Sequence, residues 1–293
     1  MTDEERARFD EASQESIRNG GLPLNAIARL QEQEKRHGTP EQFFSSDLSV
    51  NELLLTRQCG YEPLGQVMGS CVYNVGWQYI PQGVWVYSSQ EFSVLSGAHM
   101  EARKLAFNRL QQEAALLKAD GVVGVRFIRK GEGLFQNGLE YIALGTAVRA
   151  INEKDRYPGP PFVSNLTGQQ HYALRQEGFR PVGFVFGNCT WLQYPDWRSQ
   201  NALLSFRNAE LTSLTQGMYT ARSLAVGRME AEAISLSAKG VVQAVIEHSI
   251  EEIEANNSRY FLMTFLSFGT AIASDYRSSE VGEVKPIVSL SSN

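Results

Sequence analysis

The chain has 293 residues, of which 43% are hydrophobic and 20% charged, as is ordinary for a globular protein. Its formal net charge is -5, from 27 Lys and Arg against 32 Asp and Glu, and this balance lacks the basic excess that a nucleic-acid partner needs. No apolar run approaches the roughly 20 residues that span a bilayer, and the charged N-terminus lacks an apolar segment, so we expect neither a membrane protein nor a signal peptide.

One stretch of the chain occurs twice, and the other predicted elements are arranged around it. Residues 57–71 and 175–189 are identical at eight of fifteen positions, at a constant offset of 118. Residues 101–123 and 220–242 are identical at twelve of 23 positions, at an offset of 119. An internal repeat of this length indicates two copies of one structural unit.

Residues 1–45 precede the repeat as a polar arm in which we expect two short helices. Residues 3–17 can form the first, which the glycine pair at 20–21 would end, and residues 24–38 can form the second. The arm is either a docking segment for a protein partner or a sister chain, or a mobile segment that folds back on its own unit. Chain ends are usually tied down poorly, which favours the second reading.

Each unit is predicted to open with a short helix. Ser49 with Glu52, and Thr167 with Gln170, have the spacing of a capping box, in which two side chains satisfy free N–H groups at a helix start. A long strand follows, and its glycines suggest bulges or close backbone approach. These glycines are Gly65 and Gly69 in the first unit, and Gly183 and Gly187 in the second.

The second half of each unit is predicted as a short strand, a long helix and two strands. Glycine stops end the helices, and β-branched runs follow them as buried strands. In order, the short strands are residues 84–87 and 203–206, the helices 91–118 and 210–237, the buried strands 122–129 and 241–248, and the last strands 140–148 and 264–272.

The repeat divides the chain into two domains with additional segments. We predict an arm at residues 1–45, a first unit at 46–150, a stiff Pro-rich linker at 151–161, a second unit at 162–274 and a flexible tail at 275–293.

Two motifs in each unit resemble those of the YbjQ family of small bacterial proteins. They are LKADGVVGVRF with EYIALGTAV in unit one, and the more degenerate LSAKGVVQAVIEH with TFLSFGTAI in unit two. The resemblance covers residues 59–150 and 177–274. It implies an α+β fold with two tandem β-α-β-β domains like a dodecin subunit, and a pentameric assembly. It also implies the family's heavy-metal-binding label, which rests on structural comparison.

Five-fold symmetry constrains a chain that carries two units. A closed ring of five units cannot be filled by whole chains, so units one and two would occupy two stacked rings joined by the linker. The alternative is that the two units alternate in one larger ring with an even number of units.

Cys71 and Cys189 occupy the same repeat position and are the thiol candidates for a soft metal. No His, Asp or second Cys keeps ligand spacing with either of them, and a strand position predicts a buried small residue. The odd count of three cysteines without CxxC spacing indicates a cytoplasmic protein with reduced thiols. The sequence names no cofactor.

The long helices keep an Arg and a Glu one turn apart on one face. These are Arg109 with Glu113 in unit one, and Arg228 with Glu232 in unit two. They could line a central pore, contact a neighbouring subunit, where charged pairs set register and partner choice, or form ordinary i,i+4 ion pairs.

All four tryptophans are expected in the two segments between the first and second strands of the units, namely Trp77, Trp85, Trp191 and Trp197. Such a concentration favours a protein interface first, a local core second and a small-molecule pocket third.

No catalytic motif is present in the sequence, and we expect no enzyme. The function we predict is a non-enzymatic, homo-oligomeric protein that forms a ring or shell. The alternatives are a heavy-metal-binding or metal-sensing protein and a small-molecule binder that uses the aromatic segments.

Overall fold

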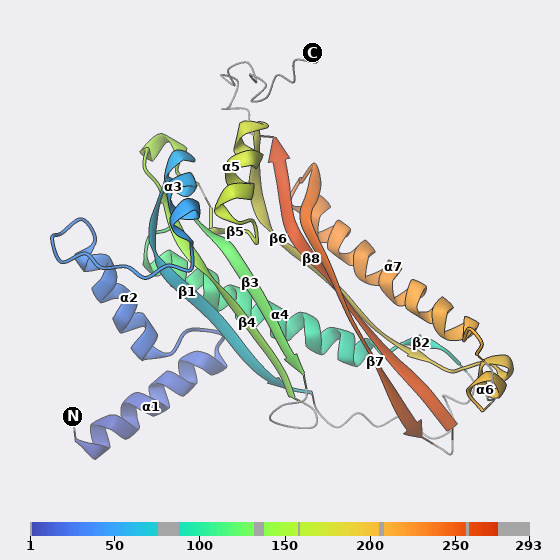
Figure 1. The fold of residues 1–293 in the computed structure, drawn as a ribbon. Coiled ribbons are helices and arrows are strands. Elements are labelled where there is room, and N and C mark those ends of the chain that lie inside the picture. The colour runs from blue at the N-terminus through green and yellow to red at the C-terminus, as the bar shows by residue number, and fades with distance from the viewer. Residues whose placement is uncertain are drawn as a thin grey trace, which may run out of the picture.

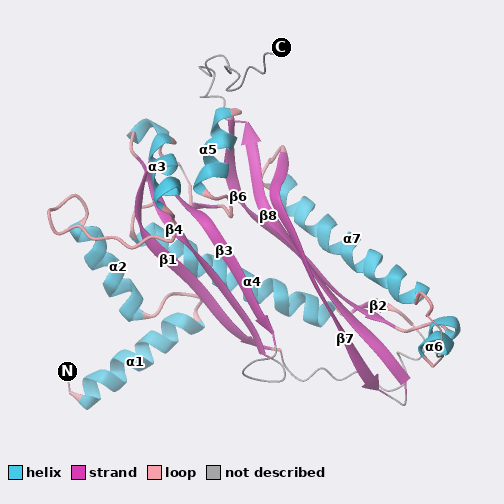
Figure 2. Cartoon of the chain, viewed as in Figure 1, coloured by secondary structure: helices cyan, strands magenta, loops and turns pink. Residues whose placement is uncertain are grey.

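The computed structural model describes residues 2–75, 88–131, 138–157, 159–204, 208–255 and 258–274. The fold is α+β, as predicted. The two sheets lie beside each other with the helix of unit one between them, and the helix of unit two covers the far side of the second sheet (Figure 1). Each half contains one long helix and three long strands (Figure 2). None of the described helices is long and apolar enough to cross a membrane.

The N-terminal arm forms the two expected helices, α1 (Asp3–Arg18) and α2 (Leu24–Arg36). Helix α2 lies beside the first sheet, where Leu30 is fully buried among residues of unit one (Figure 1). The Gln33 side chain donates a hydrogen bond to the Leu64 carbonyl oxygen at 2.9 Å. The arm therefore folds back on its own unit.

Unit one begins with its capping box and continues through one helix and an antiparallel sheet. Its elements are α3 (Val50–Gln58), β1 (Tyr61–Asn74), β2 (Gln90–Glu91), α4 (Ser93–Leu116), β3 (Gly121–Gly131) and β4 (Gly138–Ala150). The sheet order is β1-β4-β3-β5, where β5 (Phe162–Val163) follows the linker, so β1 is an edge strand. The box closes as predicted, with Ser49 accepting from the Glu52 N–H and the Glu52 carboxylate accepting from the Ser49 N–H.

Unit two repeats this order. Its elements are α5 (Gly168–Gln176), β6 (Phe179–Gln193), α6 (Trp197–Leu203), α7 (Thr212–Ser235), β7 (Gly240–Ala255) and β8 (Ser258–Ser274). The sheet order is β2-β6-β8-β7, and the second capping box is also formed. The strand orders β1-β4-β3 and β6-β8-β7 are the same.

The prediction of a short strand at residues 203–206 was wrong at the positions that the structure describes. Leu203 ends helix α6, which starts where the Asp196 side chain accepts a hydrogen bond from the Ser199 N–H. Residues 84–87 lie outside the described residues, as do Trp77, Trp85 and the tail at 275–293. Strand β2 pairs with β6 of the other unit, because β6 otherwise ends the second sheet with open backbone groups.

In each unit, one of the two paired glycines marks a β-bulge and the other allows close backbone approach. The register of β1 shifts between Pro63 and Gly65, and that of β6 shifts between Pro181 and Gly183, so the first glycine of each pair marks a bulge. The second glycine of each pair lets the long helix approach the edge strand closely, as described below.

The linker is held against unit one. It contains a 3-10 turn, η1 (Glu153–Asp155), and leads to β5 (Phe162–Val163), which pairs in parallel with β3. The buried Asp120 carboxylate accepts hydrogen bonds from the Tyr157 N–H and the Arg156 side chain. These contacts fix the start of unit two against the first sheet.

Candidate assembly interface

In unit one, the Arg and Glu of helix α4 hold the open edge of β1. Glu113 accepts a hydrogen bond from the Met68 N–H at 2.8 Å, and Arg109 donates to the Ser70 carbonyl oxygen at 2.6 Å. Gly69 lies between these two residues, and a Cβ there would collide with the Ala106 carbonyl oxygen. Only glycine lets the helix backbone come close enough for both bonds.

Unit two contains the same arrangement at the equivalent positions. Glu232 accepts from the Phe186 N–H at 2.7 Å, and Arg228 donates to the Asn188 carbonyl oxygen at 2.6 Å. Gly187 lies between them and would collide with the helix if it carried a Cβ. We call each set of Arg, Glu and two backbone groups an edge clamp.

Each edge clamp satisfies backbone groups that an edge strand leaves unpaired, and does so with charged side chains that form stronger bonds than neutral ones. The Arg and Glu of each helix thus bond to the strand at the distances given above, and the structure gives the pair a role other than an ordinary i,i+4 ion pair. Their role at an interface between subunits stays a prediction.

The outer side of the first edge clamp is covered by the arm. Arg109 also donates to the carbonyl oxygens of Ile17 and Gly21, at 3.0 and 3.1 Å. Arg29 on α2 lies 3.5 Å from the Glu113 carboxylate.

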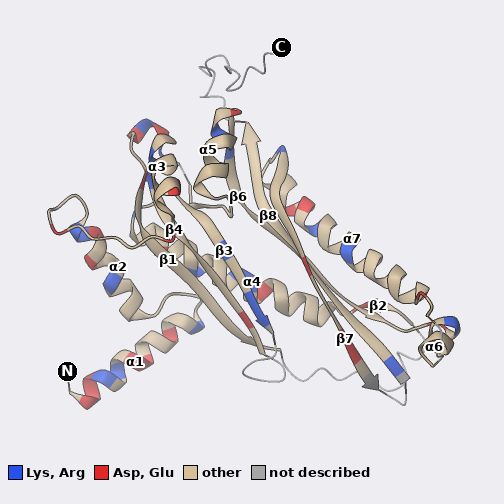
Figure 3. Cartoon of the chain, in the orientation of Figure 1, with Lys and Arg blue, Asp and Glu red and all other residues tan. Residues whose placement is uncertain are grey.

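The outer side of the second edge clamp is covered by unit one. Glu91 on β2 accepts two bonds from Arg228, at 2.6 and 2.8 Å. Arg103 on α4 donates two bonds to Glu232, at 2.8 and 2.7 Å, and is 6% exposed. Figure 3 shows charged residues of both signs along α4 and α7.

Aromatic rings continue this contact between the units. The Phe107 ring on α4 stacks on the Phe184 ring at a centroid distance of 4.6 Å. Phe127 on β3 meets Phe186 at 5.8 Å and Phe268 at 5.2 Å. These residues belong to one core cluster that includes residues of both units. We call this contact, with Glu91–Arg228 and Arg103–Glu232, the seam.

The electrostatic settings of the seam and of the first edge clamp differ. The hydrogen bond from Arg228 lowers the pKa of Glu91 below its ordinary value. Burial raises the pKa of Glu113, against the opposing effects of the Met68 N–H and Arg29. The seam therefore favours an ionised carboxylate, whereas the clamp under the arm disfavours one.

Cys71 and Cys189 lie in the apolar cores of separate units. Burial raises the pKa of both thiols, to about 12 for Cys189, so the metal-binding thiolate form is disfavoured. Among the described residues, no group of three or more His, Cys, Asp or Glu is placed to hold a metal ion. The donor set described here does not fit the metal that the family label implies.

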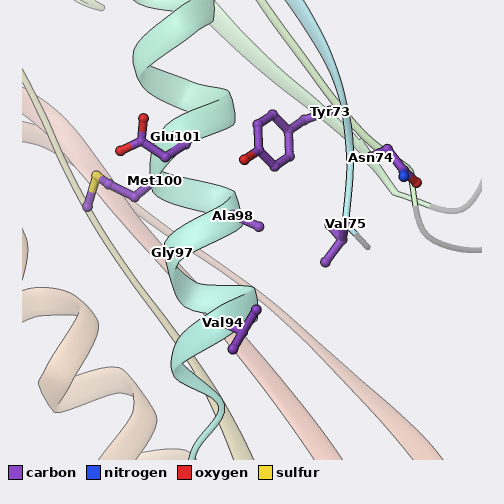
Figure 4. Close-up of a pocket in the computed structure, with 8 residues that line it drawn as sticks. All are labelled: Tyr73, Asn74, Val75, Val94, Gly97, Ala98, Met100 and Glu101. Carbon is purple, nitrogen blue, oxygen red and sulfur yellow. The ribbon is translucent and has the colours of Figure 1, made fainter. Parts of the chain in front are cut away.

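The aromatic segments are described only in part. Trp191 was predicted to follow the first strand, but it lies within β6, where it packs against the core of unit two and donates to the Gln193 side chain. Trp197 is exposed at the start of α6. Near the start of the first segment, a pocket of about 400 Å³ lies between the end of β1 and α4, and the Tyr73 side chain extends toward the helix (Figure 4). Its other lining residues are Asn74, Val75, Val94, Gly97, Ala98, Met100 and Glu101.

Sequence reasoning missed Glu91 and Arg103, which complete the seam. A signal was present, because Arg103 is identical to Arg222 within the second repeated block and Glu91 corresponds to Glu210 at the same offset of 119. Charged residues that are identical in both copies therefore predict an interface even where they lie outside the shared face of the long helices.

Comparisons with known proteins agree with the first repeat. Residues 61–151 match the YbjQ family model, described as "Putative heavy-metal-binding". The encapsulin nanocompartment protein Rv1762c of Mycobacterium tuberculosis is 42% identical over 205 residues, which cover 69% of this chain and 77% of that protein. UPF0145 proteins of Halorubrum lacusprofundi and Clostridium novyi are 39% and 33% identical, over 30% and 31% of this chain and 84% and 86% of theirs.

The fold and the edge clamps define a protein of two similar α+β units joined by a buried seam. The chain belongs to the YbjQ (UPF0145) family, because it covers most of the length of these relatives at well over a quarter identity. None of the three relatives' names describes an enzyme.

Proposed function

We propose that this chain is a non-enzymatic, self-assembling protein whose copies form a closed ring or part of a shell. The seam carries the proposal: it joins one face of unit one to a different face of unit two, with paired charges around stacked aromatic rings. A contact between unlike faces of similar units can be repeated from copy to copy, and such head-to-tail contacts close into rings.

The seam supports the alternation of units one and two in one ring over two separate stacked rings. Unit one lies directly against unit two, so each unit already has the other kind as its neighbour. A ring of five chains is compatible with this alternation, because cyclic symmetry acts on whole chains. We also propose that residues 162–274 are a second YbjQ-like domain after 46–150, since both follow the same strand order.

The name of the mycobacterial relative supports an assembly role, because it describes a nanocompartment protein. We propose the cytoplasm as the place of assembly, since the three cysteines are free and buried.

The test is the mass of the full chain, purified without a metal-binding tag, by size exclusion with light scattering. We expect a single species at a multiple of the 32.7 kDa chain mass, without stoichiometric metal. A monomer at every concentration would contradict self-assembly, and stoichiometric zinc or copper would favour a metal-binding role.

The matched Arg and Glu residues are tested in the same experiment. Arg109→Glu places like charges beside Glu113 and should lower the assembled mass, whereas Lys104→Glu on the exposed side of α4 should not. Equal masses for both variants would mean that the edge clamp serves its own unit alone.

A further inference from the structure

The face that unit one presents to the seam has a counterpart on unit two. At the offset of 119, Glu91, Met100, Arg103 and Phe107 correspond to Glu210, Tyr219, Arg222 and Val226. The charged residues are identical in type, and three of the four residues lie on α7 at helical spacing. Unit two therefore carries a second copy of the face with which unit one binds it.

This second face is open. Arg103 is 6% exposed in the seam, whereas its counterpart Arg222 is exposed. Tyr219 is 65% exposed, and Glu210 is also exposed. We call Glu210, Tyr219, Arg222 and Val226 the α7 face. A large aromatic ring between two exposed charges is typical of an interface centre.

The complementary surface on unit one is open along the C-terminal half of β1. Phe186 and Thr190 of β6 are fully buried, whereas their counterparts Met68 and Val72 are 44% and 61% exposed. The chain thus contains two pairs of complementary faces. One pair is in contact at the seam, and the other, the α7 face and the surface along β1, is not in contact within the chain.

The arm covers the rest of the surface on unit one in a way that reproduces the seam. Arg29 forms an ion pair with Glu113, just as Arg103 forms an ion pair with Glu232 in the seam. One helical turn later, Gln33 donates a hydrogen bond to the Leu64 carbonyl oxygen. Leu64 is two residues before Gln66, the counterpart of Phe184 in unit two, and Phe184 is the residue on which Phe107 stacks in the seam.

The α1–α2 turn completes the likeness. The carbonyl oxygens of Ile17, in the last turn of α1, and of Gly21, which follows that helix, accept hydrogen bonds from Arg109, at the position where Glu91 accepts from Arg228 in unit two. Both charged groups of the first edge clamp are therefore contacted by the arm at the points where unit one contacts the second clamp.

We propose that the α7 face of a second copy of this chain docks on β1 and α4 of unit one, and that α2 is a displaceable cap on that surface. Arg222 of the incoming copy would replace Arg29 at Glu113, and its Glu210 would replace the two carbonyl oxygens at Arg109. The proposal rests on the self-assembly proposed above and names the surface, the partner and the segment that regulates it.

Charge favours the exchange. Arg29 meets Glu113 at 3.5 Å with a side chain that is 54% exposed, whereas Arg103 makes two bonds shorter than 3 Å to Glu232 with its side chain 8% exposed. The arm also offers carbonyl oxygens to Arg109 where a second copy would offer a carboxylate, and charge-assisted bonds of that kind are stronger. The charged contacts of the cap are thus weaker than those of the contact that replaces it.

The first test compares two single variants of the full chain on α7 by light scattering over a range of concentrations. Arg222→Glu would face Glu113 and should raise the concentration needed for assembly by at least roughly 30-fold. Ser223→Glu is the matched control, because its counterpart Lys104 is exposed and outside the seam, and it should assemble like the wild type. Equal loss or equal retention in the two variants would overturn the role of the α7 face.

The second test addresses the cap through Arg29→Glu, a change at an exposed side chain that should leave the fold intact. It should release α2 and lower the concentration needed for assembly by at least about tenfold, because more copies have an open surface. Hydrogen exchange should be faster at residues 24–36 in the assembled wild type than in the dilute protein. Slower exchange there on assembly would show that the arm stays docked and would overturn the cap.

These outcomes separate this inference from the function on which it rests. A wild type that never assembles contradicts self-assembly itself. A wild type that assembles while Arg222→Glu assembles equally well leaves self-assembly standing and overturns the docking surface.

Discussion

Arg109 and Arg228 bond to equivalent carbonyl oxygens of their edge strands, and Glu113 and Glu232 bond to equivalent N–H groups two residues earlier in the same strands. What differs is the neighbour. The arm covers the clamp of unit one with two carbonyl oxygens and an exposed Arg29, whereas unit one covers the clamp of unit two with a carboxylate and a buried Arg103. The clamp therefore belongs to the unit, and its charged side chains can bind different neighbours.

The largest expected difference between the units comes from removing each clamp carboxylate. Glu232→Ala leaves Arg103 buried without its partner and should cost about 3–5 kcal/mol of unfolding free energy. Glu113→Ala leaves the Met68 N–H unsatisfied but frees an exposed Arg29, and should cost about 1–3 kcal/mol. Urea unfolding of the two variants measures both costs, and a larger cost for Glu113→Ala would contradict the comparison.

The glycines of the two clamps should respond alike. Gly69→Ala and Gly187→Ala each force the helix away from its edge strand, and each should destabilise by about 1–3 kcal/mol. Gly227→Ala on α7 is the control: its Cβ would meet open space, so it should stabilise the helix by about 0.8–1.0 kcal/mol. Thermal unfolding compares the three variants, and a stable Gly187→Ala would mean that the close approach does not matter.

The cysteines should also behave as matched core residues. Changing Cys71 and Cys189 together to Ala should leave the oligomer mass unchanged and cost a few kcal/mol at most, since each site loses one small buried group. Metal analysis accompanies the stability measurement. Zinc or copper bound stoichiometrically to the wild type and absent from the double variant would show that the thiols bind metal.

Acid should affect the seam and the first edge clamp in opposite directions, and this effect is smaller. The pKa of Glu91 is lowered from 4.5, so its stabilising contribution is fully present above about 4.5 and is lost as the pH falls through its folded-state value. The pKa of Glu113 is raised from 4.5, so its ionisation reduces stability as the pH rises above that value.

Two variants isolate these opposite slopes in unfolding experiments across the acid range. Glu91→Gln should reduce the loss of unfolding free energy that occurs as the pH falls below 4.5. Glu113→Gln should remove the loss of unfolding free energy that occurs as the pH rises above 4.5. Identical profiles for the two variants would mean that the neighbours do not set the ionisation of these carboxylates.

The repeat let the sequence predict each unit well, because caps, glycine stops and β-branched runs are local signals. Both capping boxes form, and the long helices end within two residues of the predicted positions at Leu116 and Ser235. The strand expected at residues 203–206 failed because the Asp196 cap at α6 outweighed an apolar run. Helix caps thus determined both the helices that were predicted correctly and the strand that was predicted wrongly.

The seam could not be predicted in the same way. It joins residues more than a hundred positions apart, such as Arg103 and Glu232, and the pairing of β2 with β6 depends on which edge strand is open. The matched Arg and Glu were visible in the sequence, but their bonds to backbone groups need the close approach at Gly69 and Gly187. The positions of the matched Arg and Glu residues could be predicted from the sequence, whereas the groups to which they bond depend on tertiary packing.

The most direct test of the claim that the seam is repeated between copies is a high-resolution structure of the assembled wild type by electron microscopy. We predict a closed particle in which Arg222 of one chain meets Glu113 of the next, with α2 displaced from β1 and units one and two alternating around the ring. An assembly in which α2 stays on β1 while chains contact one another through other surfaces would contradict the claim.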